Sequence, residues 1–140
     1  MVVLEPVAQA TVMTAERWDS GFRFRVIAPY IVEAETVFTA HHQGHTGWVH
    51  GGVVAAVLDE ALGRALISAH PGRLMVTARL ELRYFKAIAI GERVTIRGEI
   101  VSDRRHLATG VCQVLIGDGA VAARADGTLA RPFTRPPGVR

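Results

Sequence analysis

Cysteine is almost absent from this sequence: Cys112 is the only one in 140 residues. A single thiol excludes an intramolecular disulfide, and its place in the apolar stretch 111–116 predicts a small, buried and unreactive side chain. The first ten residues also lack the basic leader and apolar core of a secretion signal. These absences predict a protein of a reducing compartment, the cytoplasm.

Long apolar runs and a strong excess of charge are missing as well. The longest mostly apolar run, residues 53–68, contains three charged side chains and is shorter than the ~20 residues of a membrane span. The net charge is only +3, and part of it comes from the Pro- and Arg-rich segment 132–140, which predicts a flexible tail. The rest has no basic stripe with interleaved aromatic residues, so neither a membrane nor a nucleic acid is expected as a partner.

What remains is the composition of a globular domain, with 49% hydrophobic and 21% charged residues. The chain fits one domain, which we place at residues 21–131, after an N-terminal arm over residues 1–20. A proline-free stretch rich in alanine, leucine and valine predicts a helix over residues 52–69, ended by His70-Pro71-Gly72. Runs of β-formers and alternating residues predict strands over residues 22–28, 31–40, 76–84, 93–102, 107–116 and 121–130.

The predicted helix is apolar on nearly all sides, so it must be buried on most of its faces. Two strands, one buried helix and four longer antiparallel strands form an α+β layout in which a curved sheet wraps a central helix. In the first of the four long strands, the even-numbered residues from Val76 to Tyr84 form the apolar face. Thr77 is then expected on the opposite face, with the charged residues up to Arg83.

Asp59 is the residue of this helix that most needs an explanation. An unpaired buried carboxylate costs on the order of several kcal/mol. Glu60 can pair with Arg64 along an exposed edge, whereas the helical neighbours of Asp59 are alanine, glycine and leucine. A carboxylate with room beside it suits a general base or nucleophile; a solvated position at the helix edge is the alternative.

Gly51 and Gly52 stand where the helix is expected to begin. Unpaired backbone N–H groups and the positive end of the helix dipole favour an anion there, and a carbonyl oxygen that becomes an oxyanion would fit. The alternative is that the two glycines only permit a tight turn and close packing.

These residues together resemble a known family. His50-Gly51-Gly52 followed by Asp59, with Gly47 three residues before the histidine, is similar to the motif of hotdog-fold acyl-CoA thioesterases, especially the phenylacetate-pathway and human thioesterase-superfamily members. The order of the predicted helix and strands also resembles that fold over roughly residues 22–131. The resemblance implies hydrolysis of an acyl-CoA or related thioester to a carboxylic acid and a free thiol, without a metal or other cofactor.

Residue by residue, the resemblance implies distinct roles. Gly51 matches the amide that binds the oxyanion, and Asp59 matches the catalytic carboxylate. His50 matches the histidine that helps to arrange the thioester carbonyl. Thr77, seven residues before Tyr84, matches the hydroxyl residue that helps to position the water.

One position departs from the family pattern. Gly44 lies where many relatives carry Asn or Gln to bind the thioester carbonyl, so Gln43 or His45 is expected to substitute. Gly52 and Trp48 complete the expected substrate-binding residues, with Trp48 at a subunit contact, over the acyl pocket or in the core. The histidines of this loop lack the spacing of metal ligands, so no metal site is expected.

The spacing of Gly51 and Asp59 bears on assembly. The two are eight residues apart, or ~12 Å along a helix at 1.5 Å per residue, so one chain cannot bring both to a single thioester carbon. Either one of them is uninvolved, or a second chain completes the site and a two-fold dimer holds two equivalent sites. The resemblance implies the second, a homodimer or homotetramer.

Two other functions are compatible with the sequence. A hydratase or dehydratase of this fold commonly has a histidine five residues after the acid, where this chain has Arg64. A non-catalytic acyl-CoA-binding domain would keep the pocket without turnover. Four basic residues are candidates to hold the phosphates of coenzyme A, and the sequence does not choose among them: Arg73, Lys86, Arg104 and Arg105.

Overall fold

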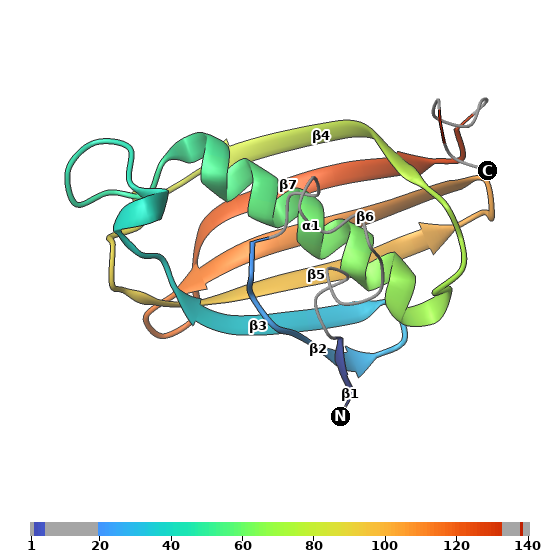
Figure 1. Cartoon of the computed structure of the whole chain (residues 1–140), viewed down its shortest axis with the longest axis horizontal. Helices are drawn as coiled ribbons and strands as arrows, with labels where there is room; N and C mark the ends of the chain where they lie inside the picture. The colour runs from blue at the N-terminus through green and yellow to red at the C-terminus, as the bar shows by residue number, and fades with distance from the viewer. Residues whose placement is uncertain (1, 5–19, 133–137, 139–140) are drawn as a thin grey trace.

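The computed structural model describes residues 2–4, 20–132 and 138, so the predicted arm and tail lie mostly outside the described residues. In the described part, one long helix lies across a curved antiparallel sheet of seven strands in the order β1-β2-β3-β5-β6-β7-β4 (Figure 1). This confirms the predicted α+β hotdog fold. The elements are β1 (Val2–Leu4), β2 (Phe24–Ala28), β3 (Ile31–Val37), a 3-10 helix η3 (Ala40–His42), α1 (Gly51–Ala69), β4 (Val76–Tyr84), β5 (Arg93–Asp103), β6 (Leu107–Ile116) and β7 (Ala120–Ala130).

The largest differences from the prediction lie in the first three strands, where β2 begins at Phe24 rather than at residue 22. β1, which pairs with β2 at one edge of the sheet, was not predicted because three residues are too short to show an alternating pattern. The strand predicted to continue to residue 40 ends at Val37, because the chain turns into η3. Thr39 caps this turn, and its N–H donates to Nδ1 of His42 over 2.9 Å.

The helix packs directly against the concave face of the sheet, as its apolar composition predicts. Gly98 of β5 makes the close approach possible, since a Cβ there would lie 2.5 Å from the carbonyl oxygen of Ala61. Cys112 of β6 lies in the same core, where burial raises the pKa of its thiol to about 12. This confirms the prediction of a buried cysteine. None of the described helices is long and apolar enough to span a membrane.

Glu60 and Arg64 of α1 form the predicted pair, but its predicted exposure was wrong. Arg64 Nη2 lies 3.3 Å from Glu60 Oε1, and the two side chains are only 6% and 10% exposed. The chain ahead of β2 reaches this part of the helix, since the N–H of Ser20 donates to Glu60 Oε2 over 3.2 Å. The side of the helix that carries Glu60 and Arg64 is therefore covered by the chain, whereas the local sequence pattern predicted that it is exposed to solvent.

Candidate active site

A β-bulge in β4 decides which of its side chains face the helix. Thr77 pairs with Leu129 of β7, whereas Arg79 pairs with the next residue of β7 toward the N-terminus, so Ala78 is an extra residue. Directly paired residues point to the same face of a sheet. Because Leu129 lies in the core, Thr77 points toward the helix side. The prediction that Thr77 shares the charged face of β4 was wrong, because it assumed unbroken alternation.

The bulge brings Thr77 to Asp59, near the middle of the helix. Thr77 Oγ1 donates a hydrogen bond to Asp59 Oδ1 over 2.6 Å, a length typical of a bond to a carboxylate. Asp59 is half-buried and keeps its second oxygen for another partner. The odd spacing of seven between Thr77 and Tyr84 would place them on opposite faces of a regular strand. The bulge places both on the helix side, where Tyr84 pairs with the buried Ala123.

His50 caps the beginning of the helix and occupies one of its amides. Its Nδ1 accepts a hydrogen bond from the N–H of Gly52 over 2.9 Å. The Gly52 amide is therefore engaged within the chain, and the substrate-binding role of Gly52 stays a prediction that does not depend on this N–H. The N–H of Gly51 has no acceptor within the described residues, and Gly51 is exposed. The helix thus offers one amide donor, that of Gly51, to an oxyanion.

The loop before the helix explains the departure at Gly44. A Cβ at Gly44 would lie 3.1 Å from Cα of His50, so a small residue lets the loop pack closely against the capping histidine. The side-chain oxygen of Gln43 accepts from the N–H of Gly47 over 2.8 Å, which leaves only its NH₂ group for a substrate. His45 is exposed, as is Trp48 at 49%, which excludes core packing for Trp48 and leaves a subunit contact or a place over the acyl pocket.

Of the other two histidines of this region, one packs against aromatic rings and one is exposed. The ring of His42 packs against those of Phe22 and Phe38, with centroids 5.8 and 5.4 Å apart, and His41 is exposed. Among the described residues, no group of three His, Cys, Asp or Glu side chains is placed to hold a metal ion.

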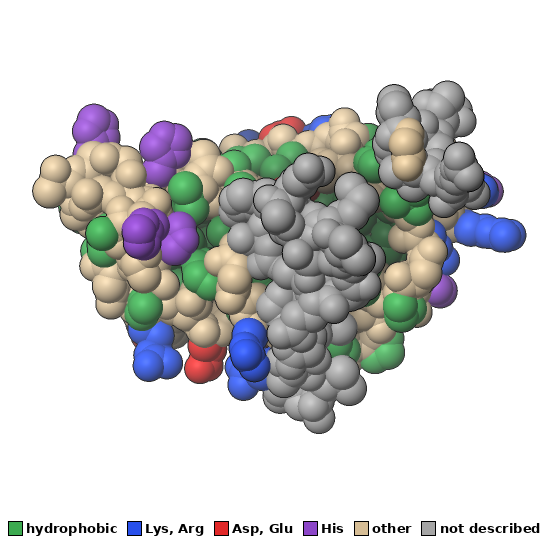
Figure 2. Space-filling view, viewed as in Figure 1, with side chains coloured by type: hydrophobic (Ala, Val, Ile, Leu, Met, Phe, Trp, Pro, Cys, Tyr) green, Lys and Arg blue, Asp and Glu red, His purple; other side chains and the backbone are tan. Residues whose placement is uncertain are grey.

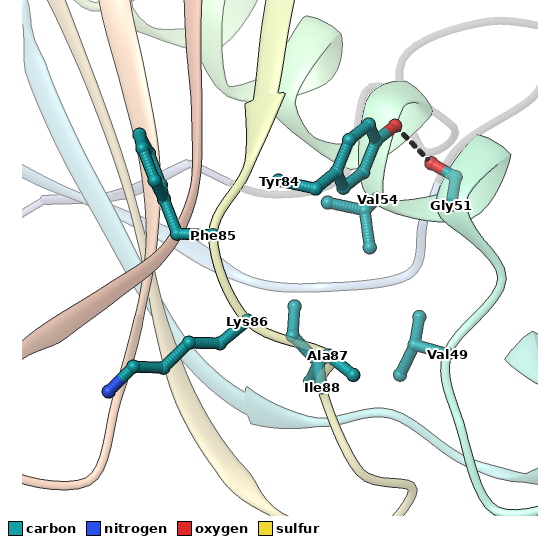
Figure 3. A pocket seen from close by; sticks show the side chains of 8 residues that line it. All are labelled: Val49, Gly51, Val54, Tyr84, Phe85, Lys86, Ala87 and Ile88. Atoms are coloured by element: carbon teal, nitrogen blue, oxygen red, sulfur yellow. Dashed lines mark hydrogen bonds between the residues drawn. The ribbon is translucent and has the colours of Figure 1, made fainter.

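In the sequence, Tyr84 was noted only for its distance of seven residues from Thr77. In the structure it contacts the first residue of α1 directly. Its hydroxyl donates to the carbonyl oxygen of Gly51 over 2.7 Å (Figure 3). A tyrosine is already protonated at neutral pH, and burial raises the pKa of Tyr84 further, so the phenol is a hydrogen-bond donor. A polar aromatic residue at the end of an otherwise apolar strand face was the signal that could have identified it.

A mainly apolar pocket of about 270 Å³ lies between Tyr84 and the helix beginning. Gly51 stands at its rim, and Lys86, whose ammonium group points away from Gly51, is the charged residue of its lining (Figure 3). A pocket of this kind beside an amide donor suits an uncharged group attached to a carbonyl. Its lining consists of Val49, Gly51, Val54, Tyr84, Phe85, Lys86, Ala87 and Ile88.

Comparison with known proteins identifies the family. The family model of the thioesterase superfamily matches residues 46–123. This chain belongs to the thioesterase superfamily. The match includes both hydrogen-bonded pairs, Thr77 with Asp59 and Tyr84 with Gly51. No curated protein matches the sequence.

Several solved structures, one of them of a thioesterase superfamily protein, share this architecture. One thioesterase superfamily protein is 29% identical with a TM-score of 0.71, over 79% of this chain but only 55% of its own length. A mutant of the phenylacetic acid degradation protein PaaI from Thermus thermophilus is 27% identical with a TM-score of 0.68, over 78% of this chain and 91% of its own. A Streptococcus mutans protein bound to acetyl-CoA is 23% identical with a TM-score of 0.75, over 86% and 95% of the two chains, and shows the fold alone.

Proposed function

We propose that this protein hydrolyses an acyl-CoA thioester to a carboxylic acid and free coenzyme A. The observation that carries the proposal is the 2.6 Å hydrogen bond from Thr77 to Asp59, which orients a half-buried carboxylate on an apolar helix. Membership of the thioesterase superfamily supports the reaction class. The S. mutans protein of the same fold binds acetyl-CoA, which supports an acyl-CoA as the ligand.

Each residue then has a role that follows from its contacts. The N–H of Gly51 donates to the thioester oxygen and stabilises the negative charge that forms when the carbonyl carbon is attacked. Asp59 takes a proton from the attacking water, and this proton reaches the thiolate that leaves when the carbon–sulfur bond breaks. In the alternative route Asp59 attacks the carbon itself and the thiolate leaves; water then hydrolyses the resulting anhydride, which frees the carboxylic acid and Asp59 and supplies the proton of the thiol. Thr77 holds one carboxylate oxygen so that the other faces the substrate. His50 fixes the helix beginning that carries the amide.

Gly51 and Asp59 lie eight residues apart in the same helix, so a site that uses both of them requires two chains. β4 lies at an edge of the sheet and pairs only with β7 among the described strands. The other edge of this nine-residue strand presents unpaired backbone groups, and its two ends carry exposed hydrophobic surface, the side chain of Val76 and the ring of Tyr84. Such an edge is a template for a strand of another chain. These features support a homodimer, or a tetramer of two such dimers.

Two-fold pairing of β4 with its copy would complete the site. Antiparallel pairing about the middle of the strand places the start of one strand opposite the end of the other. Thr77 lies near the start of β4 and Tyr84 at its end. The carboxylate of one protomer, held by Thr77, would therefore come next to the amide of the other, held by Tyr84.

Thiol release measured with a panel of acyl-CoAs tests the proposed function. The panel includes short and long aliphatic chains and aromatic acyl groups, and we expect turnover of at least one of them. Affinity for acyl-CoAs without thiol release would instead establish a binding domain. Addition or removal of water at an enoyl-CoA, with the thioester intact, would establish a hydratase or dehydratase.

Thr77→Val is expected to lower kcat about tenfold or more, because it keeps the shape and β-branching but removes the hydroxyl that holds Asp59. The melting temperature should change little, and Thr77→Ser should retain most activity. Steady-state kinetics of the two variants check this. Wild-type turnover in Thr77→Val would show that another group orients the carboxylate.

Tyr84→Phe is expected to lower kcat roughly threefold to tenfold with little change in KM, because the ring still lines the pocket while the hydrogen bond to the Gly51 carbonyl is lost. Tyr84→Leu, which also removes the ring, should raise KM in addition. If Tyr84→Phe raised KM alone, the hydroxyl would contact substrate rather than position the helix beginning.

A further inference from the structure

Three arginines gather at the end of the molecule where β5 turns into β6. Arg104 and Arg105 form the turn of this hairpin, and the N–H of Arg104 donates to the carbonyl oxygen of Leu107 over 2.9 Å. Arg131 follows β7, and its N–H donates to the carbonyl oxygen of His106 over 3.0 Å. All three arginines are exposed, and basic side chains project from this end in Figure 2. Backbone hydrogen bonds therefore hold two distant segments together as one arginine cluster, Arg104, Arg105 and Arg131.

No carboxylate among the described residues neutralises the charge of the arginine cluster. The nearby carboxylate, Asp103, is already bound by Arg73 at 2.6 Å and by the hydroxyl of Tyr30 at 2.9 Å. Burial alone would raise the pKa of Asp103, but hydrogen bonds from the Arg105 N–H, Tyr30 and Arg73 outweigh it and hold the pKa below its usual range. Within the described residues, no side chain of the cluster forms an ion pair.

Several other described arginines are paired with carboxylates, and those without an ion pair, Arg23 and Arg83, lie apart from this hairpin. On the outer face of the sheet, Arg97 lies 2.7 Å from Glu33, Arg124 lies 3.3 Å from Asp126 and Arg79 lies 2.6 Å from Glu81. The presence or absence of a carboxylate partner also distinguishes the four basic residues that the sequence offers for binding the phosphates of coenzyme A. Arg73 is engaged by Asp103, and Lys86 is a single cation whose ammonium group points away from Gly51 (Figure 3). Arg104 and Arg105 remain, and the fold adds Arg131 to them.

The arginine cluster lies a short distance across the sheet from the catalytic carboxylate. Ala130, the residue before Arg131, pairs with Val76 on one side and with Leu107 on the other. Val76 is next to Thr77, which holds Asp59. With strands about 4.8 Å apart, the step from β4 across β7 to β6 is about 10 Å. Coenzyme A has its thiol and its phosphates at opposite ends of a long arm, so one molecule can reach both places.

We propose that Arg104, Arg105 and Arg131 bind the phosphate groups of coenzyme A. The proposal rests on the proposed function, because it assumes that the thioester lies at Asp59. Guanidinium groups bind phosphate oxygens through paired N–H donors, and three of them without carboxylate partners match the several negative charges of the coenzyme. The enzyme would then select acyl-CoA over the same acyl group on a thiol without phosphates.

The experiment compares two thiol carriers of the same acyl group, coenzyme A and pantetheine, which lacks the nucleotide and its phosphates. In wild type, KM should be at least about tenfold lower for the acyl-CoA. The variant R104Q/R105Q/R131Q should raise KM for acyl-CoA about tenfold, leave kcat nearly unchanged and leave hydrolysis of acyl-pantetheine as in wild type. Added salt should reduce the wild-type preference for acyl-CoA and have little effect on the variant.

Arg93→Gln is the matched control, since this arginine is 79% exposed and lies at the opposite end of β5. It should behave as wild type. Calorimetric binding of free coenzyme A and of pantetheine provides a readout without turnover. A wild type that hydrolyses neither thioester but binds coenzyme A through the three arginines would overturn the proposed function alone. Equal affinity of wild type for coenzyme A and pantetheine, or an unchanged triple variant, would overturn the phosphate site alone.

Discussion

Asp59→Asn is expected to lower kcat by about a hundredfold or more while fold and assembly stay intact. The amide is nearly isosteric with the carboxylate, but it can neither attack a thioester nor accept a proton from water. Asp59 is half-buried, and the hydroxyl of Thr77 can still donate to the amide oxygen, so the surrounding structure should tolerate the change. Thiol-release kinetics, with melting temperature and light scattering on the same sample, measure the effect.

Glu60→Gln is the neighbouring control. Because Glu60 pairs with the buried Arg64, this variant should lower the melting temperature while kcat stays within about threefold of wild type. The two adjacent carboxylates are thereby distinguished, because the change at Asp59 should lower kcat and the change at Glu60 should lower the melting temperature. Equal losses of kcat in both variants, or a larger loss at Glu60, would refute the assignment of Asp59 as the catalytic carboxylate.

Gly51→Pro is expected to abolish measurable turnover, because it removes the one N–H that the helix beginning offers to an oxyanion. Proline is well suited to the first position of a helix, and it requires the preceding residue to be extended. His50 already has φ −63° and ψ 132°, so the backbone accommodates the change. A Cβ at residue 51 makes only ordinary contact with Tyr84, at 3.7 Å. Gly51→Ala, which keeps the N–H, should therefore retain most activity.

Mixing the two inactive variants tests whether each site uses two chains. A hybrid dimer of Asp59→Asn and Gly51→Pro contains one site with both native residues and one site with neither. If subunits exchange freely at equal concentrations, half of the dimers are hybrids and the mixture should recover about a quarter of wild-type activity. Co-expression with two different tags, followed by purification of the hybrid, removes the dependence on exchange. A fully active monomer in light scattering would exclude the two-chain site.

The prediction of the fold depended on signals that are local in sequence. Alanine, leucine and valine without proline determine the helix that ends at Ala69, and alternation determines the four long strands to within a residue at each end. Asp59 could be singled out because helical neighbours are set by spacing alone, and none of them can neutralise it. Gly51 followed in the same way from its place at a helix beginning, where amides lack acceptors.

Tertiary structure decided which side chains meet. The bulge at Ala78 arises from pairing with β7, and it moves Thr77 from the face that alternation predicts to the face of Asp59. Likewise, Tyr84 contacts Gly51 from another element, and Arg131 joins the β5–β6 hairpin through a hydrogen bond to His106. Sequence pattern determines the period of each element, because that depends on neighbouring residues. Strand register and the contacts between elements depend on pairing and packing between residues that lie far apart along the chain. Only the folded structure shows which of these residues meet.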